Sequence, residues 1–327
     1  MQYEEKGRVI QGVGGLFEVA LDAGATPLSG RHIAARAKGN FRHEGITPLP
    51  GDRVLIAFDD TAFRVGEDGE AIPVSDGGGA VIAEILPRKN ALIRPPMANL
   101  DILLIAMAAA EPAPATETVD KLISIAEYND IEPVLVIGKR DLAPDVAAEL
   151  ATIYTAAGFT VFTLSAKLGE GIEPLREWLL QNMTGKTAAF AGASGVGKST
   201  LLNALFPGLS LQTGEISKKI ARGKHTTRRV QLYPYHGAEN AYVSDTPGFS
   251  MLDFVRFDFF KKEDLPLTMR EFEPYLGECR YTKCTHTKEQ GCAVLAAMRE
   301  GRIKKSRHDS YLAMFEALKN KHDWSKK

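Results

Sequence analysis

Short apolar runs broken by glycine, proline and aspartate fill the first part of the chain, up to about residue 95. Examples are GRVIQGVGGLFEVAL, RHIAARAKG and GDRVLIAFDD. Strands of this length with turn residues between them predict a small all-β sandwich or barrel. The segment IRPPMAN at 93–99 contains two prolines, which helices and inner strands tolerate poorly, and it predicts a linker.

From about residue 100 to 250, apolar strand-like runs alternate with amphipathic helical runs. Strands are predicted in LDILLIAMA, EPVLVIGKRDL and FTVFTLSAK, and helices in ATETVDKLISIAEYND, PDVAAELATIYTAAG and GIEPLREWLLQNM. This alternation predicts a mainly parallel sheet covered by helices on both faces. The pattern from about 260 to 327 is mostly helical. No apolar run approaches the roughly 20 residues that a membrane helix needs, so we expect a cytosolic protein.

Charge changes this picture only locally. The formal net charge of the 327-residue chain is −1, which gives no overall attraction to nucleic acid. Residues 218–229 hold six Lys or Arg and no acid, and residues 299–327 hold nine against four Asp or Glu. Either segment could contact RNA phosphates, and either could be a solvated face. Residues 1–95 hold eleven Lys or Arg against thirteen Asp or Glu, whereas a barrel that holds RNA is expected to be more basic.

The segment AFAGASGVGKSTLLNALF at 189–206 matches the phosphate-loop pattern G-x-x-x-x-G-K-S in full, between a predicted strand and a predicted helix. Glycines let backbone N–H groups turn toward phosphate oxygens, and the helix adds its positive N-terminal end. Lys198 neutralises the terminal phosphates, and the Ser199 hydroxyl can ligate Mg²⁺. The loop alone does not choose between ATP and GTP. The candidate phosphate-binding residues are Gly192, Ala193, Ser194, Gly195, Val196, Gly197, Lys198, Ser199 and Thr200.

Two short motifs end consecutive predicted strands, where open α/β sheets bind ligands. GKRD resembles the Asn-Lys-x-Asp guanine motif of GTPases, and SAK resembles the Ser-Ala-Lys element that supports the same base. The Asp141 carboxylate can accept hydrogen bonds from guanine N1–H and the exocyclic amine, a donor pair that adenine lacks. The aliphatic stems of Lys139 and Lys167 can flank the purine. The candidate base-binding residues are Gly138, Lys139, Arg140, Asp141, Ser165, Ala166 and Lys167.

Two motifs after the phosphate loop are candidates for sensing the γ-phosphate. VSDTPGFS ends a predicted strand in Asp-x-x-Gly, so Asp245 can hold Mg²⁺ through a water and the Gly248 amide can approach the γ-phosphate. In GKHTT, which lies where the first switch belongs, Thr226 or Thr227 could complete the Mg²⁺ shell. The candidate Mg²⁺ ligands are Ser199, Thr226 and Asp245.

The residue after the Asp-x-x-Gly glycine is Phe249, where many GTPases place a water-orienting glutamine. Because a phenyl ring cannot polarise water, intrinsic hydrolysis should be slow unless another group substitutes. His225 is the nearest candidate catalytic residue in the switch, and chemistry alone leaves it equally open that it is a solvated loop histidine.

The only cysteines fall within fourteen residues, as Cys279, Cys284 and Cys292, with His286 between them. An odd count in a short polar segment argues against disulfides and toward a metal. Three thiolates and one imidazole suit a tetrahedral structural Zn²⁺ with no open position for catalysis. The candidate zinc ligands are Cys279, Cys284, His286 and Cys292.

The motifs run in the order base motif, Ser-Ala-Lys, phosphate loop, first switch and Asp-x-x-Gly. Ordinary GTPases carry the phosphate loop first, so this order resembles a circularly permuted GTPase. With GKHTT and the spacing from Cys279 to Cys292, the chain resembles the bacterial ribosome small subunit-dependent GTPase A family over nearly its full length. The resemblance implies three domains: an N-terminal OB-fold β-barrel at 1–95, a circularly permuted α/β P-loop GTPase domain at 96–258, and a mostly α zinc-binding domain at 259–327.

The resemblance also implies a function. The family hydrolyses GTP to GDP and phosphate, acts late in maturation of the small ribosomal subunit, and is stimulated by the ribosome. It implies that His225 takes part in hydrolysis, and that the barrel and the zinc module bind ribosomal RNA near the decoding region. We expect a monomer with one structural Zn²⁺, with Mg²⁺ bound together with GTP, and without a membrane partner.

One residue departs from the family pattern, and two other functions stay open. Gly138 replaces the motif's asparagine, whose side chain normally contacts the purine and braces the phosphate loop, so guanine affinity should fall by about 0.5–1.5 kcal/mol. The alternatives are a P-loop ATPase or nucleotide kinase with a structural zinc module, and a nucleic-acid-binding protein whose nucleotide site is only a switch.

Overall fold

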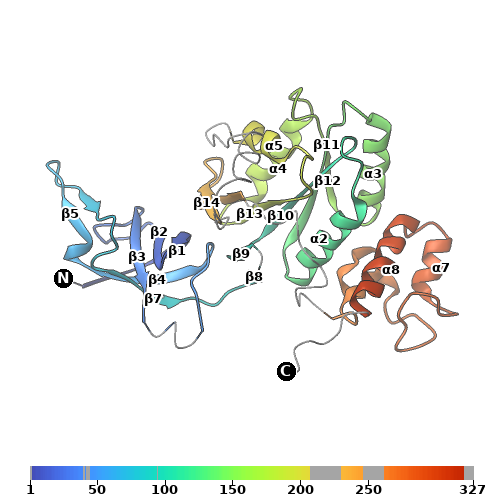
Figure 1. Cartoon of the computed structure of the whole chain (residues 1–327), viewed down its shortest axis with the longest axis horizontal. Helices are drawn as coiled ribbons and strands as arrows, with labels where there is room; N and C mark the ends of the chain where they lie inside the picture. Colours follow the sequence, from blue (N-terminus) through green and yellow to red (C-terminus); the bar gives the residue numbers. More distant parts are fainter. Residues whose placement is uncertain are drawn as a thin grey trace, which may run out of the picture. The chain divides into compact units, whose positions relative to one another are not determined.

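The computed structural model describes residues 2–39, 41, 45–93, 95–206, 230–245 and 261–319. Three parts follow one another along the chain: a five-stranded barrel, an α/β sheet and a helical part that carries the cysteine cluster (Figure 1). These are the parts that the sequence predicts. Within the described residues, no helix is long and apolar enough to cross a membrane.

The N-terminal part is a closed barrel with the strand order β1-β2-β3-β7-β4. Its β3 and β7 pair in parallel, whereas the other neighbours are antiparallel. Alternate residues of the strands point inward and leave almost no exposed surface, as at Val19, Val54 and Ile82. The OB-fold expectation of a five-stranded barrel is therefore confirmed. The strands are β1 (Gln2–Val13), β2 (Leu16–Leu21), β3 (His32–Ala37), β4 (Arg53–Asp59) and β7 (Ala80–Ile85).

Two small hairpins lie outside the barrel ladder, β5 (Phe63–Val65) with β6 (Ala71–Pro73) and β8 (Ala91–Ile93) with β9 (Pro96–Ala98). The linker prediction for 93–99 is wrong, because this segment forms part of the second hairpin. Leu92 and Met97 pair across it and are buried. The prolines are accommodated because Pro95 lies in the turn and Pro96 is the first residue of its strand.

The central sheet has the order β12-β11-β10-β13-β15-β14. All neighbouring pairs described residue by residue are parallel except β14 with β15, so the prediction of a mainly parallel sheet is confirmed. Every residue of β10 is buried, which requires cover on both faces of the sheet. The strands are β10 (Ile102–Ala108), β11 (Glu132–Gly138), β12 (Thr160–Thr163), β13 (Thr187–Ala191), β14 (Gln231–Pro234) and β15 (Tyr242–Asp245).

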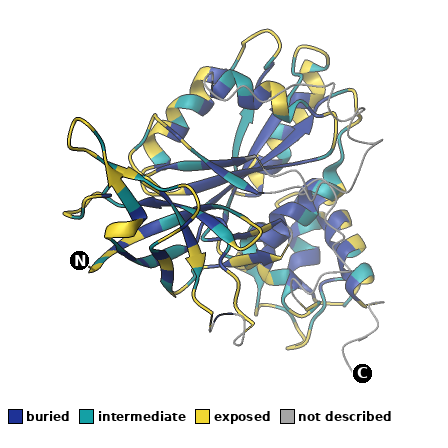
Figure 2. Ribbon diagram, turned by 60° about the vertical axis from the view of Figure 1, so that its left-hand side comes forward, coloured by how far each residue is buried: buried dark blue, intermediate teal, exposed yellow. Residues whose placement is uncertain are grey.

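Within the described residues, four helices accompany this sheet. Helix α2 packs against β10 and β11, α3 packs against β11 and β12, and α4 contacts α5. The strands lie in the buried interior, while the helices expose their outer faces (Figure 2). The helices are α2 (Thr116–Tyr128), α3 (Pro144–Ala156), α4 (Ile172–Asn182) and α5 (Lys198–Leu205).

The C-terminal part consists of short helices around an aromatic core. Phe272 lies 5.0 Å from Tyr311 between ring centroids, and both side chains are fully buried. Helix α8 packs against α2, where the Ser124 hydroxyl donates to the Met314 sulfur at 3.6 Å. The helices are η3 (Leu265–Thr268), η4 (Arg270–Tyr275), α7 (Ala293–Arg299) and α8 (Lys305–Lys319).

In the described part of the basic segment, residues 299–319, one Lys or Arg side chain is buried. Arg307 is 1% exposed and forms ion pairs with Asp120 of α2 and with Glu271 of η4. Lys305 and Lys319 pair with acids on their own helix, Asp309 and Glu316. Among the described residues of this segment, Arg307 is therefore used inside the fold, whereas Lys305 and Lys319 stay largely exposed beside their acids.

Candidate nucleotide site and metal centre

The phosphate-loop motif lies between β13 and α5, as predicted. Gly192, Gly195 and Gly197 have φ values of +134°, +81° and +99°, which side-chain-bearing residues rarely adopt. A Cβ at Gly192 would lie 2.1 Å from the Ala106 carbonyl oxygen of β10. Only glycine lets the loop leave β13 this close to the neighbouring strand.

Two further contacts set the shape of the loop. Val196 packs with Ala106 and Ala108 at the end of β10, which anchors the loop by apolar contact. The Lys198 ammonium donates to the carbonyl oxygens of Gly192 and Ala193 at 2.8 and 2.7 Å. The positive charge thus lies inside the loop, and the Ser199 and Thr200 side chains at the start of α5 are exposed.

A pocket of about 320 Å³ joins the phosphate-loop helix to both base motifs. Gly138, Lys139 and Asp141 line it from the end of β11, and Ser165, Ala166 and Lys167 from the loop after β12. Val196, Gly197 and Thr200 complete the wall on the phosphate-loop side. The structure therefore brings together, in one cavity, three motifs that are up to about sixty residues apart in the chain.

The strand-end loops hold these residues in place by backbone hydrogen bonds. The Arg140 N–H donates to the Leu164 carbonyl oxygen at 3.1 Å, which ties the two base motifs together. Ser165 and Glu170 exchange backbone hydrogen bonds of 2.9 and 3.1 Å, so the loop folds back with Ala166 and Lys167 near its tip. Arg140 itself points to Glu170 rather than into the pocket lining.

The sequence did not identify the apolar residues that line this pocket. Ala106, Met107, Val136, Leu142, Leu164 and Leu201 also line it. Of these, Leu142 directly follows the base motif and is 54% exposed, which could have marked it as a ligand contact. The others are buried apolar residues of strands, of a helix or, for Leu164, of the position directly after β12, so their sequence pattern indicates only a core.

The remaining predicted nucleotide residues fall outside the described part of the chain. His225, Thr226, Thr227 and Gly248 lie outside it entirely. Asp245 is the last residue of β15, whose strand is described without the position of this side chain. Those assignments stay predictions.

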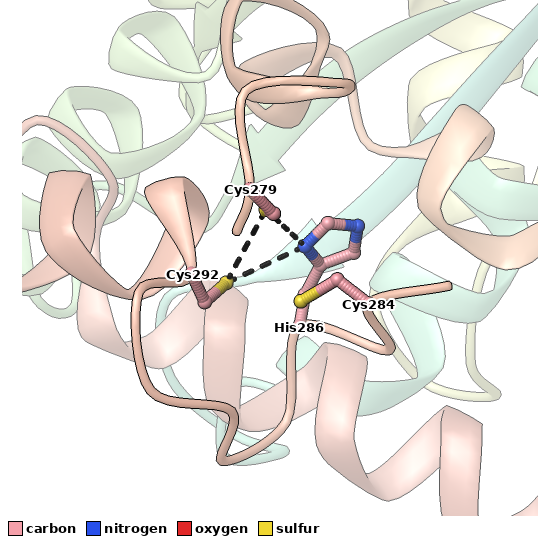
Figure 3. Close-up of side chains that lie close together, drawn as sticks. All are labelled: Cys279, Cys284, His286 and Cys292. Carbon is pink, nitrogen blue, oxygen red and sulfur yellow. Dashed lines mark hydrogen bonds between the residues drawn. The ribbon is translucent and has the colours of Figure 1, made fainter. Parts of the chain in front are cut away.

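The four predicted metal ligands come together in the loop before α7 (Figure 3). Their ligand atoms all lie within 4.8 Å of one another. His286 Nδ1 is 3.6 Å from the Cys279 sulfur and 3.5 Å from the Cys292 sulfur, and these two sulfurs are 3.9 Å apart. Three thiols and one imidazole converging on one point indicate a metal site.

Neighbouring groups pre-organise this loop. The Glu289 carboxylate accepts backbone N–H bonds from Thr285 and Thr287 at 2.8 and 3.0 Å. Burial alone would raise the pKa of Glu289, but hydrogen bonds from the Thr285 hydroxyl and from the backbone N–H groups of Thr285 and Lys288 outweigh it and lower the pKa to about 2, so the carboxylate stays charged. The His286 carbonyl accepts from His308 Nε2 of α8 at 2.8 Å, which ties the loop to the helical core.

The protonation states also fit a bound cation. Burial raises the pKa of Cys284 to about 12 and raises the pKa of Cys292, so without a cation these thiols stay protonated at neutral pH. A divalent ion reverses this preference, because it binds the thiolate directly. Burial also lowers the pKa of His286, which keeps the imidazole neutral as a ligand has to be.

The order of the elements around the pocket defines the class of protein. The base-motif strands β11 and β12 precede the phosphate loop in the chain, yet all three meet at one pocket of the sheet. This is a circularly permuted P-loop GTPase. The chain belongs to the RsgA family, because the model described as RsgA GTPase matches residues 85–255 and the RsgA N-terminal domain matches residues 6–62.

Relatives and solved structures extend over nearly the whole chain. The small ribosomal subunit biogenesis GTPase RsgA of Agathobacter rectalis is 38% identical and covers 96% of this chain and 98% of its own. The protein of that name from Moorella thermoacetica is 39% identical, with 94% and 95% covered. YjeQ from Thermotoga maritima superposes with a TM-score of 0.76 at 31% identity, covering 98% of this chain and all of its own. YloQ, described as a circularly permuted GTPase, gives 0.74 at 29% identity, covering 98% and 96%.

Proposed function

We propose that this protein hydrolyses GTP to GDP and phosphate as a late assembly factor of the small ribosomal subunit, and that the subunit stimulates hydrolysis. The observation that carries the proposal is the single pocket in which Asp141, the Ser-Ala-Lys residues and the phosphate loop meet. A carboxylate at this position accepts from guanine and repels adenine, which has no matching donor pair. The relatives named for small ribosomal subunit biogenesis support the same role.

The phosphate end of the site requires Mg²⁺. In our proposal the Ser199 hydroxyl, Asp245 through a water, and Thr226 or its neighbour Thr227 hold the ion, and Lys198 neutralises the phosphates. The Gly248 amide approaches the γ-phosphate. His225 takes the part of the missing glutamine, because Phe249 cannot orient water. His225→Ala should then lower kcat without changing GTP affinity, in single-turnover and binding assays.

The metal centre is proposed to hold one structural Zn²⁺. With Zn–S bonds of about 2.3 Å, tetrahedral coordination separates two sulfurs by roughly 3.8 Å, close to the 3.9 Å between Cys279 and Cys292. Four protein ligands leave no position for a substrate, so the ion orders the loop rather than acting on GTP. The zinc part at 259–327 and the barrel at 1–95, which follow and precede the GTPase domain at 96–258 in the chain, are proposed to contact ribosomal RNA. The chain is proposed to act as a cytosolic monomer.

The test is GTP hydrolysis measured with and without purified small ribosomal subunits, alongside ATP. We expect GTP turnover to be slow alone, to rise when subunits are added, and to exceed ATP turnover in both conditions. A preference for ATP would replace the proposal by a P-loop ATPase or kinase. GTP turnover unaffected by subunits, with normal GTP binding, would overturn the assembly role and leave only the nucleotide assignment.

A further inference from the structure

The two halves of the nucleotide pocket need a fixed spacing, because one ligand bridges them. The base half consists of the loops after β11 and β12, and the phosphate half is the loop after β13. In the Asn-Lys-x-Asp motif an asparagine side chain braces the phosphate loop. Gly138 lacks that side chain, although a Cβ there would meet only the carbonyl oxygens of Val196 and Met107, at 3.6 and 3.7 Å. The Cβ of an asparagine would therefore fit, in ordinary contact with the phosphate loop at Val196.

A short segment at 109–112, here called the strap, contacts both halves. Its first residue donates from the Ala109 N–H to the Gly138 carbonyl oxygen at 2.9 Å. The Lys139 ammonium donates to the Glu111 carbonyl oxygen. Pro112 then lies against the phosphate loop, since its Cδ would be 3.8 Å from a Cβ at Gly195. Within four residues, the strap thus reaches the base motif twice and the phosphate loop once.

The backbone at both ends of the lysine contact is held in an unfavourable region. Glu111 has φ +47° and Lys139 has φ +57°, both in the left-handed region although neither is glycine. Such residues persist where the surroundings determine their conformation, and they concentrate at ligand sites. The hydrogen bond between these two residues supplies such a determinant.

We propose that the strap ties the base half of the site to the phosphate half and thereby slows nucleotide release. In the usual motif the asparagine side chain connects the base motif to the phosphate loop. Here the Lys139–Glu111 hydrogen bond makes that connection through the strap. The inference rests on the proposed guanine-nucleotide function. Lys139 then has two roles, since its stem flanks the purine and its ammonium positions the strap. If the strap and an asparagine side chain at 138 both connect the two halves, Gly138→Asn should change nucleotide release little while the Lys139–Glu111 bond is present. It should slow release when that bond has been removed.

The experiment measures the release rate of fluorescent mant-GDP from the full chain by stopped flow. Lys139→Met keeps the aliphatic stem and removes the donor to Glu111. Lys167→Met is the matched control, because it makes the same change at another lysine that lines the pocket. We expect release from Lys139→Met to exceed that from Lys167→Met by roughly 2- to 12-fold, the value of one hydrogen bond. Lys139→Arg, which keeps a donor, should stay close to wild type.

A second substitution tests whether fast release from Lys139→Met comes from the lost strap contact or from general damage to the site. Adding Gly138→Asn to Lys139→Met should restore slow release, whereas Gly138→Ala, which adds only the Cβ, should not. Because the strap already ties the two halves in the wild type, the same Asn substitution there should change release less than twofold, in place of the roughly 2- to 12-fold effect that the motif alone predicts. Equal rates for the two Met variants, or an equal effect of Gly138→Asn in both backgrounds, would overturn the strap. Failure of the wild type to bind mant-GDP at all would instead overturn the proposed function.

If Lys139→Met does not fold, as judged by its melting curve, the comparison of Gly138→Asn with Gly138→Ala in the wild type still decides. The strap predicts that both are near neutral. A marked slowing by Gly138→Asn alone would show that the halves are untied in the native chain and would refute the inference.

Discussion

At the scale of single residues, Gly192 is the tightest point of the phosphate loop, and we predict that Gly192→Ala weakens GTP binding. Its Cβ would overlap the Ala106 carbonyl, which belongs to a buried strand and cannot move away cheaply. Overpacking of this kind costs about 1–3 kcal/mol, equivalent to roughly 5- to 150-fold in affinity. The measurement is mant-GTP titration. Gly185→Ala is the control, since it also has a positive φ but opens onto free space, and it should leave affinity unchanged.

In the proposed guanine site Asp141 selects the base, so Asp141→Asn should exchange guanine for xanthine. The amide can donate to the xanthine oxygen but can no longer accept both guanine protons. We expect GTP affinity to fall on the order of 100-fold or more, and XTP to bind better than GTP. Competition binding with both nucleotides checks this. Asp145→Asn, an exposed change in the first turn of α3, serves as control, and unaltered GTP selectivity in Asp141→Asn would refute the base assignment.

The residues of the nucleotide site differ in how far the sequence alone could identify them. The glycines and Lys198 form a contiguous motif, because phosphate binding uses consecutive backbone N–H groups. Glu111 and Leu142 carry no motif. Glu111 acts through its carbonyl oxygen, which every residue has, and Leu142 acts through apolar area. A backbone carbonyl oxygen is present at every position, and an apolar side chain is equally typical of a core. Neither contribution therefore produces a motif that a single sequence reveals.

At the scale of elements, the loop between Cys279 and Cys292 should depend on its metal. It has no regular helix or strand, and its order rests on the four ligands, on Glu289 and on hydrogen bonds from α8 to its backbone carbonyls. Chelation, or Cys292→Ser, should reduce bound zinc from about one ion per chain to nearly none and remove hydrogen-exchange protection there. Metal analysis and hydrogen exchange provide the readouts. Thr282→Ala, an exposed change in the same loop, should retain both metal and protection.

The segment at 93–99 is the place where the element predicted from the sequence differs from the one in the structure. Two prolines predicted a linker, whereas the structure has a hairpin with Pro95 in its turn. Proline excludes only those strand positions that need a backbone donor. Whether a given position needs one depends on the partner strand, which the local sequence does not reveal.

At the scale of the whole molecule, the C-terminal part is joined to α2 and α3 through a buried charge cluster. Arg307 pairs with Asp120 and Glu271, and the Tyr154 hydroxyl donates to Asp120 at 3.0 Å. Arg307→Met would leave two carboxylates buried without a cation, and we expect it to lower the free energy of unfolding by about 3–5 kcal/mol. Denaturant unfolding measures this. Arg299→Met, at an exposed position of α7, should change stability by less than about 0.5 kcal/mol.

The same cluster predicts a pH effect of defined sign. Burial raises the pKa of Asp120 above its ordinary value, although Arg307 and the hydrogen bonds oppose the rise. The native state therefore binds this proton more tightly than the unfolded state, so ionisation of Asp120 costs stability as the pH rises. Relative to wild type, Asp120→Asn should accordingly become more stable as the pH increases from about 4 to 7. A stability difference that stays constant, or that moves the other way, would contradict this.

The sequence was enough to identify those features of the protein that depend on residues close together in the chain. The phosphate loop, the strand-end base motifs, the cysteine spacing and the alternation of strands and helices are local patterns, and their order along the chain was enough to suggest a permuted GTPase. Tertiary structure alone decided which distant groups share a space: that Arg307 of a basic segment is buried against Asp120, and that residues 109–112 join the two halves of the nucleotide pocket. The reason is physical. Local motifs depend on backbone geometry that neighbouring residues control, whereas burial and long-range pairing depend on packing of the whole chain.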